Sequence, residues 1–216
     1  MVNDKNTKVH FFILLVVLAV FIWSVIKPAG YLTWAMEVAP AVVGLTIVIA
    51  IYNKFRLTTL SYIIIAILAI IMFVGGHYTY SRVPLFDWVK DVFNFNRNHY
   101  DRFGHLIKGL FAIVIREILL RKTPLSQGSW LFGIVTSISL SIAALYEIIE
   151  WLVSKITKGG KAAKDFLGTQ GSIWDTQWDM SLALVGTILA LLIFSKLHDS
   201  QLKNLSYKKY SNGKKN

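Results

Sequence analysis

The amino-acid sequence predicts an all-α membrane protein: a bundle of six transmembrane helices that forms one domain over residues 1–200. Of its 216 residues, 55% are hydrophobic and only 16% are charged, whereas soluble domains carry about 25% charged residues. The hydrophobic residues also form separate runs close to the ~20 residues that a helix needs to cross about 30 Å of hydrocarbon. Because backbone polar groups must be paired within lipid, each run is expected to be helical.

The first expected span is the run "HFFILLVVLAVFIWSVI", which follows two lysines in the manner of a secretory signal peptide. The next segment, "KPAGYLTW", lacks a clear small-x-small cleavage site, and the run is long for a signal peptide. We therefore expect an uncleaved span. The six expected spans cover residues 9–26, 32–52, 58–79, 103–121, 130–152 and 178–196.

The connections between these spans differ in length and composition. The short "NKFRL" joins the second span to the third as a tight antiparallel hairpin. The connections 80–102 and 153–177 are long and rich in aromatic and polar residues. Because functional residues concentrate on such loops, we expect these two to fold over the mouth of the bundle.

The basic residues predict the orientation. Twelve of the 23 lie on the side of the two termini and nine on the other side, where they are diluted through longer loops. This bias places both termini in the cytoplasm of a multi-pass plasma (inner) membrane protein, with residues 201–216 as a basic cytoplasmic tail. The formal charge of +11 therefore indicates contact with membrane lipids, and no nucleic acid is expected as a partner.

With this orientation, nine of the twelve acidic residues and three of the five histidines fall at the outer level of the bundle. The chain has no cysteine, so a thiolate metal site is excluded. The residues of this layer are Glu37, Asp87, Asp91, Asp101, Glu147, Glu150, Asp165, Asp175, Asp179, His77, His99 and His105.

The stretch "HYDRFGH" is the first candidate metal site. Asp101 and His105 are four residues apart, so they share one face of a helix, and His99 lies in the loop just before. Imidazole and carboxylate ligands together suit zinc, manganese or iron. The alternative is a cluster at headgroup level in which these side chains only hydrogen-bond to one another.

The stretch "ALYEIIEW" places Glu147 and Glu150 on one helical face near the end of the fifth span. A carboxylate at the end of an apolar helix costs free energy unless it is paired, bound to a metal or in a water-filled cavity. Glu147 is the candidate general base, with its acidity tuned by its partner. The alternative, a glutamate that reaches out to the membrane surface, suits Glu150 better than Glu147.

The stretch "GTQGSIWDTQWDM" contributes Asp175 and Asp179, four residues apart at the mouth of the sixth span. An aspartate one turn inside a span, as expected for Asp179, is a functional-site candidate by default. The turn "GTQGS", which contains Gln170, is expected to offer backbone amides as an anion nest. The two tryptophans are adequately explained as interfacial anchors.

Arginines near the mouth are candidates for holding an anionic group. Arg97 either clamps a phosphate or pairs with Asp101, and Arg82 is the other candidate. Arg116 and Glu117 lie near the opposite end of the fourth span, where we expect surface-reaching side chains or a structural ion pair.

Four motifs resemble those of the YjdF-like family of inner-membrane proteins: "GGHYTY", "NRNHYDRFGH", "LYEIIEW" and "GTQGSIWDTQWDM". The resemblance covers about residues 30 to 196, and the last motif is long and distinctive. It implies a membrane architecture but no activity, because that family has no settled function. The family pattern has an aspartate where this chain has Ser172, which leaves the site one carboxylate short.

A fainter resemblance is to the VanZ-like membrane proteins, some of which are linked to resistance to glycopeptide antibiotics. Asp101 and His105 match their first pair, and Glu147 with Glu150 matches the second spacing, although a Glu replaces a Gln. Asp179 and Gly186 match the third motif, but Ala183 stands where Asn is expected. The likeness hints at shared ancestry and implies no drug resistance.

Three function classes remain open. The first is a metal-dependent hydrolase or transferase acting on a lipid or cell-envelope substrate, because its polar residues gather at one depth. Its metal ligands would be His99, Asp101, His105, Asp175 and Asp179, with Glu147, Arg97 and Asp179 as the catalytic candidates. The second is a transporter, favoured only by Pro40 beside Glu37, and the third is an envelope protein that binds a cation or ligand without catalysis. Further polar-site candidates are Glu37, His77, Glu150, Asp165 and Gln170.

Overall fold

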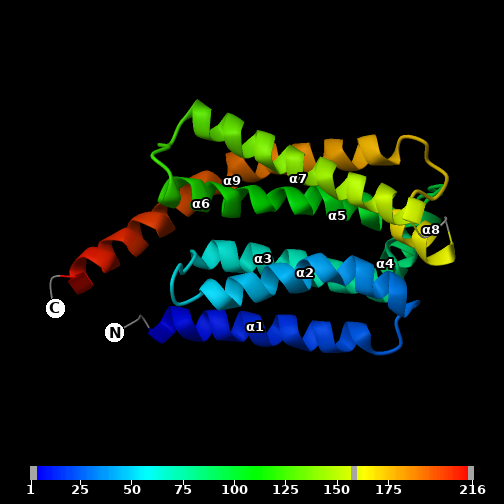
Figure 1. Cartoon of the computed structure of the whole chain (residues 1–216), viewed down its shortest axis with the longest axis horizontal. Helices are drawn as coiled ribbons and strands as arrows, with labels where there is room; N and C mark the ends of the chain where they lie inside the picture. Colours follow the sequence, from blue (N-terminus) through cyan, green and yellow to red (C-terminus); the bar gives the residue numbers. More distant parts are fainter. Residues whose placement is uncertain (1–3, 157–159, 214–216) are drawn as a thin grey trace.

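The computed structural model describes residues 4–156 and 160–213, and these residues form helices joined by short loops (Figure 1). Lys214 and Lys215, at the end of the predicted basic tail, lie outside the described residues. The long helices are α1 (Asp4–Val25), α2 (Tyr31–Ile51), α3 (Thr59–Tyr78), α7 (Ser129–Ile156) and α9 (Asp175–Gly213). The short ones are η1 (Tyr80–Arg82), α4 (Pro84–Val92), α5 (Tyr100–Lys108), η2 (Gly109–Phe111), α6 (Ala112–Lys122) and α8 (Lys161–Leu167).

Five of the predicted spans correspond to the five helices that are long and apolar enough to cross a membrane. The predicted fourth span, residues 103–121, is divided among α5, η2 and α6, which are helical at every residue from 100 to 122. Each piece is too short to cross a bilayer alone. In Figure 1, α5 and α6 nevertheless run in line through the bundle, and α1 begins at the same end at which α9 finishes.

The bundle has two halves that meet along α3. In one half, α1 and α2 pack on α3 through Val17, Val38, Ala69 and Phe73. In the other half, α6, α7 and α9 gather around a second core cluster (Figure 1). That cluster includes Leu60, Ile64, Ile113, Leu131, Val135 and Ala190.

Two glycines allow α9 to approach the α5–η2 segment closely. A Cβ atom added to Gly186 would collide with the carbonyl oxygen of Leu106, and one added to Gly109 would collide with the backbone of Gly186 and Thr187. Small residues serve this purpose at helix contacts in membranes. The contact fixes the height of α9 against α5, and both helices carry site residues.

We expect Gly186→Ala to lower the free energy of unfolding by about 1–3 kcal/mol, because the new methyl group forces two backbones apart. Gly133 of α7 is the matched control, because a Cβ added there meets nothing within 4 Å. Gly133→Ala should instead raise helix stability by about 0.5–1 kcal/mol. Unfolding in SDS, followed by circular dichroism, measures both, and equal effects of the two substitutions would refute a close contact at Gly186.

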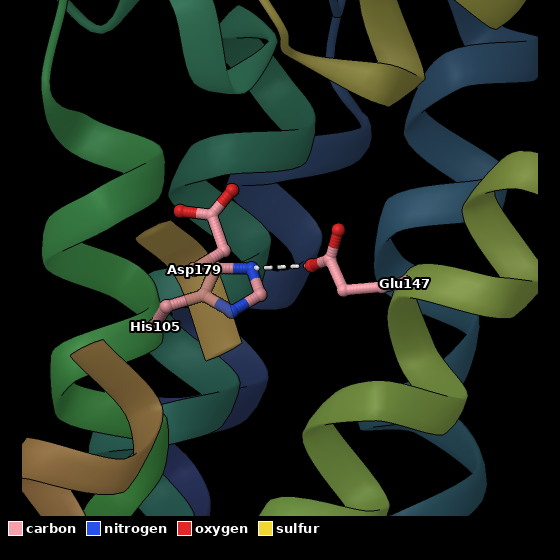
Figure 2. A group of neighbouring side chains, drawn as sticks. All are labelled: His105, Glu147 and Asp179. Carbon is pink, nitrogen blue, oxygen red and sulfur yellow. Dashed lines mark ion pairs between the residues drawn. The ribbon is translucent and has the colours of Figure 1, made fainter. Parts of the chain in front are cut away.

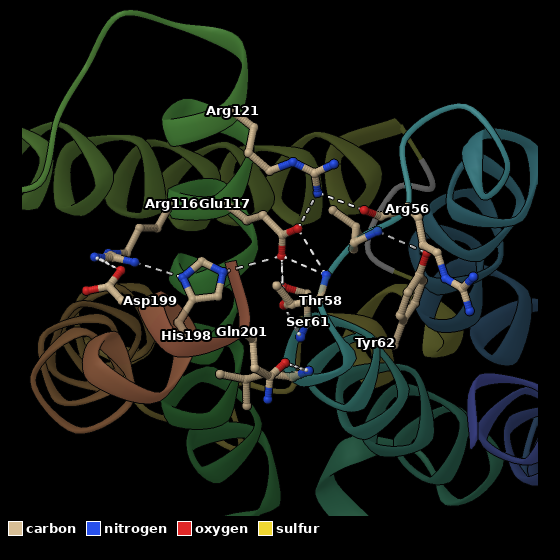
Figure 3. A network of polar contacts seen from close by, with 12 residues as sticks. Arg56, Thr58, Ser61, Tyr62, Arg116, Glu117, Arg121, His198, Asp199 and Gln201 are labelled. Carbon is tan, nitrogen blue, oxygen red and sulfur yellow. Dashed lines mark hydrogen bonds and ion pairs between the residues drawn. The ribbon is translucent and has the colours of Figure 1, made fainter. Parts of the chain in front are cut away.

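A buried polar network closes the end of the bundle near the termini (Figure 3). Glu117 of α6 is 0% exposed, and its carboxylate accepts hydrogen bonds from the backbone N–H of Thr58 (3.0 Å) and the hydroxyl of Ser61 (2.6 Å). Arg121 donates to the same carboxylate at 2.5 Å. The expectation that Glu117 reaches toward the membrane surface is therefore wrong, and the structural ion pair is confirmed.

His198 of α9 extends this network toward Arg116. The Arg116 guanidinium lies 2.8 Å from Nδ1 of His198, and a guanidinium can only donate, so Nδ1 accepts. Nε2 then carries the proton and faces Glu117 at 3.3 Å. Arg116 also pairs with Asp199 at 2.7 Å and is buried, so it does not reach toward the membrane surface either.

Candidate metal site

The site begins on α5, which carries Asp101, His105 and Lys108 along one face. Their spacings of four and three residues match the helical repeat. The helix starts at Tyr100, whose backbone N–H donates a hydrogen bond to the side-chain oxygen of Asn98 (3.0 Å). Asp101 and His105 of α5 are both buried inside the bundle.

Glu147 of α7 and Asp179 of α9 converge on His105 (Figure 2). One atom from each of the three residues lies within 4.8 Å of the other two. His105 Nε2 is 3.6 Å from a carboxylate oxygen of Glu147, and the three side chains are 1%, 7% and 3% exposed for His105, Glu147 and Asp179. The predicted polar segments of the fourth, fifth and sixth spans are thus brought together in one place.

The unprotonated ring nitrogen of His105 faces both this group and the Lys108 ammonium. Lys108 Nζ lies 3.0 Å from Nε2, and an ammonium has only protons to give, so Nε2 accepts and bears no proton. Carboxylate oxygens of Asp101 and Glu147 both lie 3.6 Å from the same nitrogen. Electron-pair donors therefore point toward one another with the Lys108 ammonium among them, and two buried carboxylates beside one ammonium leave a negative charge that a further cation would balance.

Several buried atoms of this group have no hydrogen-bond partner among the described residues. They are Glu147 Oε1 and Asp179 Oδ1, which offer lone pairs, and His105 Nδ1, which carries the proton in this tautomer and lacks an acceptor. Buried polar atoms without partners are rare in folded proteins, and each calls for an explanation such as an ion. One histidine nitrogen with two carboxylates suits Zn²⁺, Mn²⁺ or Fe²⁺, so the donor set fits the predicted metal.

Asp101, Asp175 and Asp179 form a second group whose oxygens lie within 4.8 Å of one another. This group already has cations nearby, because Asp175 is paired with Arg97 and lies 3.7 Å from Arg102. The pairing reduces its need for a metal. The group that contains His105 has one ammonium, that of Lys108, where the second group has two guanidinium groups, and it also offers a nitrogen ligand, so it is the better candidate.

The turn after α8 contacts Arg97 through its carbonyl groups. Arg97 donates to the carbonyl oxygens of Gly168 (3.2 Å) and Thr169 (3.4 Å). Gly168 has a φ of +60°, and a Cβ there would lie 2.9 Å from a carboxylate oxygen of Asp101. The tight turn predicted at "GTQGS" is confirmed, but its carbonyls are directed to a cation, which argues against an anion nest. Arg97 pairs with Asp175, so the predicted partner Asp101 was wrong.

We expect Arg97→Ala to loosen this turn, because a buried charged donor to two carbonyls and a carboxylate is lost. Hydrogen bonds to charged groups are worth about 1.5–3 kcal/mol each. Losing them lowers the free energy of local opening, so residues 165–175 should open at least about tenfold more often. Arg82→Ala is the control, since the Arg82 side chain is 50% exposed in its 2.7 Å pair with Asp165. That pair is worth about 0–1 kcal/mol. Amide hydrogen exchange read by mass spectrometry compares the two variants, and equal protection would contradict a clamp by Arg97.

Four of the predicted site residues that lie outside both groups have other partners. His77 is stacked on Trp23, with ring centroids 4.3 Å apart, and its Nδ1 is 3.1 Å from the carbonyl oxygen of Ser24. His99 packs edge-on against Phe95 at 5.1 Å. Burial lowers the pKa of His99, and the charges of Arg102 and Arg97 lower it further. Asp165 and Gln170 belong to the connections: Asp165 pairs with Arg82, and Gln170 exchanges two hydrogen bonds with the backbone of Asn98.

Glu37 and Glu150 are buried beside the group without joining it. Glu37 of α2 is 2% exposed. Glu150 of α7 is 8% exposed. Glu150 therefore does not reach out to the membrane surface, and that reading was wrong.

Two residues of the site were missed in the sequence. Lys108 lies within the expected fourth span and was not among the candidate site residues, although its position three residues after His105 places it on the same helical face. Asn98 is 1% exposed, and its amide donates to the carbonyl of Val83 (3.0 Å) and to Asp87 (2.9 Å) within its own connection. Its backbone joins the other connection through the two hydrogen bonds with Gln170. The spacing of Lys108 is a usable signal, whereas nothing in the sequence distinguishes Asn98.

Comparisons with known proteins place the chain among membrane proteins. A family model described as "Predicted membrane protein (DUF2238)" matches residues 9–200. The inner membrane protein YjdF of Escherichia coli (strain K12) is 39% identical over 185 residues, which are 85% of this chain and 88% of that protein. No solved structure gives a significant match.

Proposed function

The chain belongs to the DUF2238 family of membrane proteins. From the geometry of its buried site, we propose that it is a metal-dependent hydrolase or transferase of the membrane. It is a multi-pass protein of the plasma membrane, as its inner-membrane relative and its apolar helices indicate. The proposed metal is a divalent ion such as Zn²⁺, Mn²⁺ or Fe²⁺, held by His105, Glu147 and Asp179.

One observation carries this proposal: buried electron-pair donors converge without enough partners. The network at the other end of the bundle has similar ingredients, a histidine with acidic and basic side chains. There, both oxygens of Glu117 accept hydrogen bonds. At His105, by contrast, the carboxylates of Glu147 and Asp179 each keep a buried oxygen without a partner among the described residues. A cation fills that need.

The surrounding residues have proposed roles that follow from their positions. A bound divalent ion supplies a Lewis acid and a source of hydroxide at neutral pH. Asp101, 3.6 Å from His105, is placed to accept a proton beside the ion. Glu147, predicted from the sequence to be the general base, has a position that favours a ligand role. Lys108 is placed to attract an anionic group of the substrate.

The proposed topology has six membrane passages, with α5, η2 and α6 together forming the fourth. The shared end of α1 and α9 supports an even number of passages (Figure 1). Both termini then lie in the cytoplasm, and the metal site opens near the outer face. Fusion of a reporter active only in the periplasm to residue 94, between α4 and α5, tests this placement.

A cation-binding protein without catalysis would use the same site. A metal requirement for the turnover of a lipid or envelope substrate distinguishes the two. The hypothesis that the protein is a transporter stays a prediction, and it rests only on Pro40 beside Glu37.

Elemental analysis by mass spectrometry tests the metal proposal. Purified protein is stripped with a chelator, reloaded with Zn²⁺, Mn²⁺ or Fe²⁺, and compared with a His105→Ala, Glu147→Ala double variant. We expect about one equivalent in the wild type, as in a three-ligand catalytic site, and a loss of that metal from the double variant. His99→Ala is the matched control and should keep its metal. A wild type that stays empty, or a double variant that binds as well, refutes the proposal.

A further inference from the structure

A cavity of about 300 Å³ lies directly beneath the proposed metal site, between the two halves of the bundle. Its volume is at the lower end of the range for small-molecule sites. His105, Lys108 and Tyr146 line the end next to the site. The rest of the wall is largely apolar and includes Leu45, Leu68, Met72, Phe111, Ile115 and Ala143.

The cavity reaches the surface between α2 and α7. Pro40 of α2 and Ile142 of α7 both line it, and both are exposed. Each lies near the middle of its helix, and both helices are candidate membrane spans. A surface at that depth faces lipid hydrocarbon, so an occupant enters sideways from the bilayer.

Lys108 provides a positive charge at the end of the cavity next to the site. Lys108 Nζ lies 4.1 Å from the centroid of the Tyr146 ring and 3.0 Å from His105. The hydroxyls of Tyr146 and of Thr187, which also lines the cavity, are buried without partners among the described residues. A cation and two free hydroxyls beside an apolar chamber match an amphiphile with an anionic, oxygen-rich head.

We propose that this cavity holds the hydrocarbon chain of an anionic membrane lipid, with its headgroup at Lys108 beside the metal. The inference rests on the proposed function and names its substrate class. The chain lies against α2, α3 and α7, and the headgroup reaches the His105 group from below.

Blocking the cavity tests the inference. Gly44 of α2 lines the cavity, and a Cβ added there meets nothing within 4 Å. Gly44→Leu therefore fills the chamber without displacing backbone, and Ala143→Leu fills it from α7. Gly133→Leu is the matched control, because Gly133 has equally open space and does not line the cavity.

The measurement is photo-crosslinking in nanodiscs that contain a phosphatidylglycerol with a diazirine in its acyl chain. We expect labelling to fall at least about fivefold in Gly44→Leu and Ala143→Leu, because the new side chain takes the place of the acyl chain and lowers the affinity for the lipid. Labelling should stay unchanged in Gly133→Leu. Lys108→Met should abolish any preference over the matching phosphatidylcholine probe. Equal labelling in all variants, or an equal fall in Gly133→Leu, overturns the inference.

Metal content is measured on the same samples, so the two proposals fail separately. If the protein binds metal but the cavity variants are labelled as strongly as the wild type, the lipid inference alone is refuted. A metal-free protein whose labelling depends on Gly44 and Lys108 refutes the metal proposal and leaves the lipid site in place.

Discussion

Glu117→Ala is expected to be the most destabilising single substitution in the bundle, lowering the free energy of unfolding by about 3–5 kcal/mol. Removing one partner from a buried ion pair leaves the other charge uncompensated, which costs energy of this order. Here Arg121 loses a 2.5 Å partner, and the buried N–H of Thr58 loses its acceptor. His198 also loses the carboxylate that faces its protonated nitrogen.

Unfolding in SDS measures this loss, with Asp91→Ala as the control. Asp91 has a side chain that is 75% exposed in a 3.8 Å pair with Lys90, so its removal should cost no more than about 0.5 kcal/mol. Glu117→Gln keeps an acceptor for Thr58 but loses the charge, and we expect an intermediate loss. If Glu117→Ala and Asp91→Ala unfolded at the same SDS fraction, the network at Glu117 would not contribute to the stability of the fold.

Asp179→Asn is expected to have the largest effect on metal binding, because Asp179 belongs to both groups of converging ligands. We expect the affinity to fall by more than the 10–100-fold typical of residues that only support a ligand. The substitution changes one oxygen to an amide and keeps the size of the side chain. The fold should therefore survive, and competition with a metal-sensitive dye gives the dissociation constants.

Asp199→Asn is the control for Asp179→Asn, because both aspartates lie on α9. Asp199 is paired with Arg116 in the network at the other end. Its substitution should leave metal affinity within about twofold of the wild type, since the two ends are not in contact. A metal affinity equally reduced in both variants would indicate a general defect of α9, and would contradict a ligand role for Asp179.

Much of the fold follows from hydrophobic run length, because lipid forces apolar runs into helices. Five expected spans are found as long helices, but their ends shift where tertiary contacts extend them. α7 continues to Ile156, and α9 starts at Asp175. The fourth span was expected as a single helix. The 3₁₀ turn at Gly109 arises where α9 approaches closely, and a contact between distant segments is not visible in local sequence.

The site was predicted only in part, for similar reasons. Periodicity correctly placed Asp101 with His105, and the depth of Asp179 within its span identified it as unusual. The residues around Arg97 in the sequence do not indicate that it pairs with Asp175 and not with Asp101, because that pairing depends on how the turn after α8 folds back. The resemblance to VanZ-like proteins stays a prediction.

X-ray absorption spectroscopy at the edge of the bound metal identifies the proposed ligands directly. For the reloaded wild type with zinc, we expect nitrogen and oxygen ligands at about 2.0–2.2 Å, with the scattering signature of one imidazole. That signature should disappear in His105→Asn and persist in His99→Asn. A metal that shows only water-like oxygen ligands, or an imidazole signature unchanged in His105→Asn, would contradict a metal site at His105, Glu147 and Asp179.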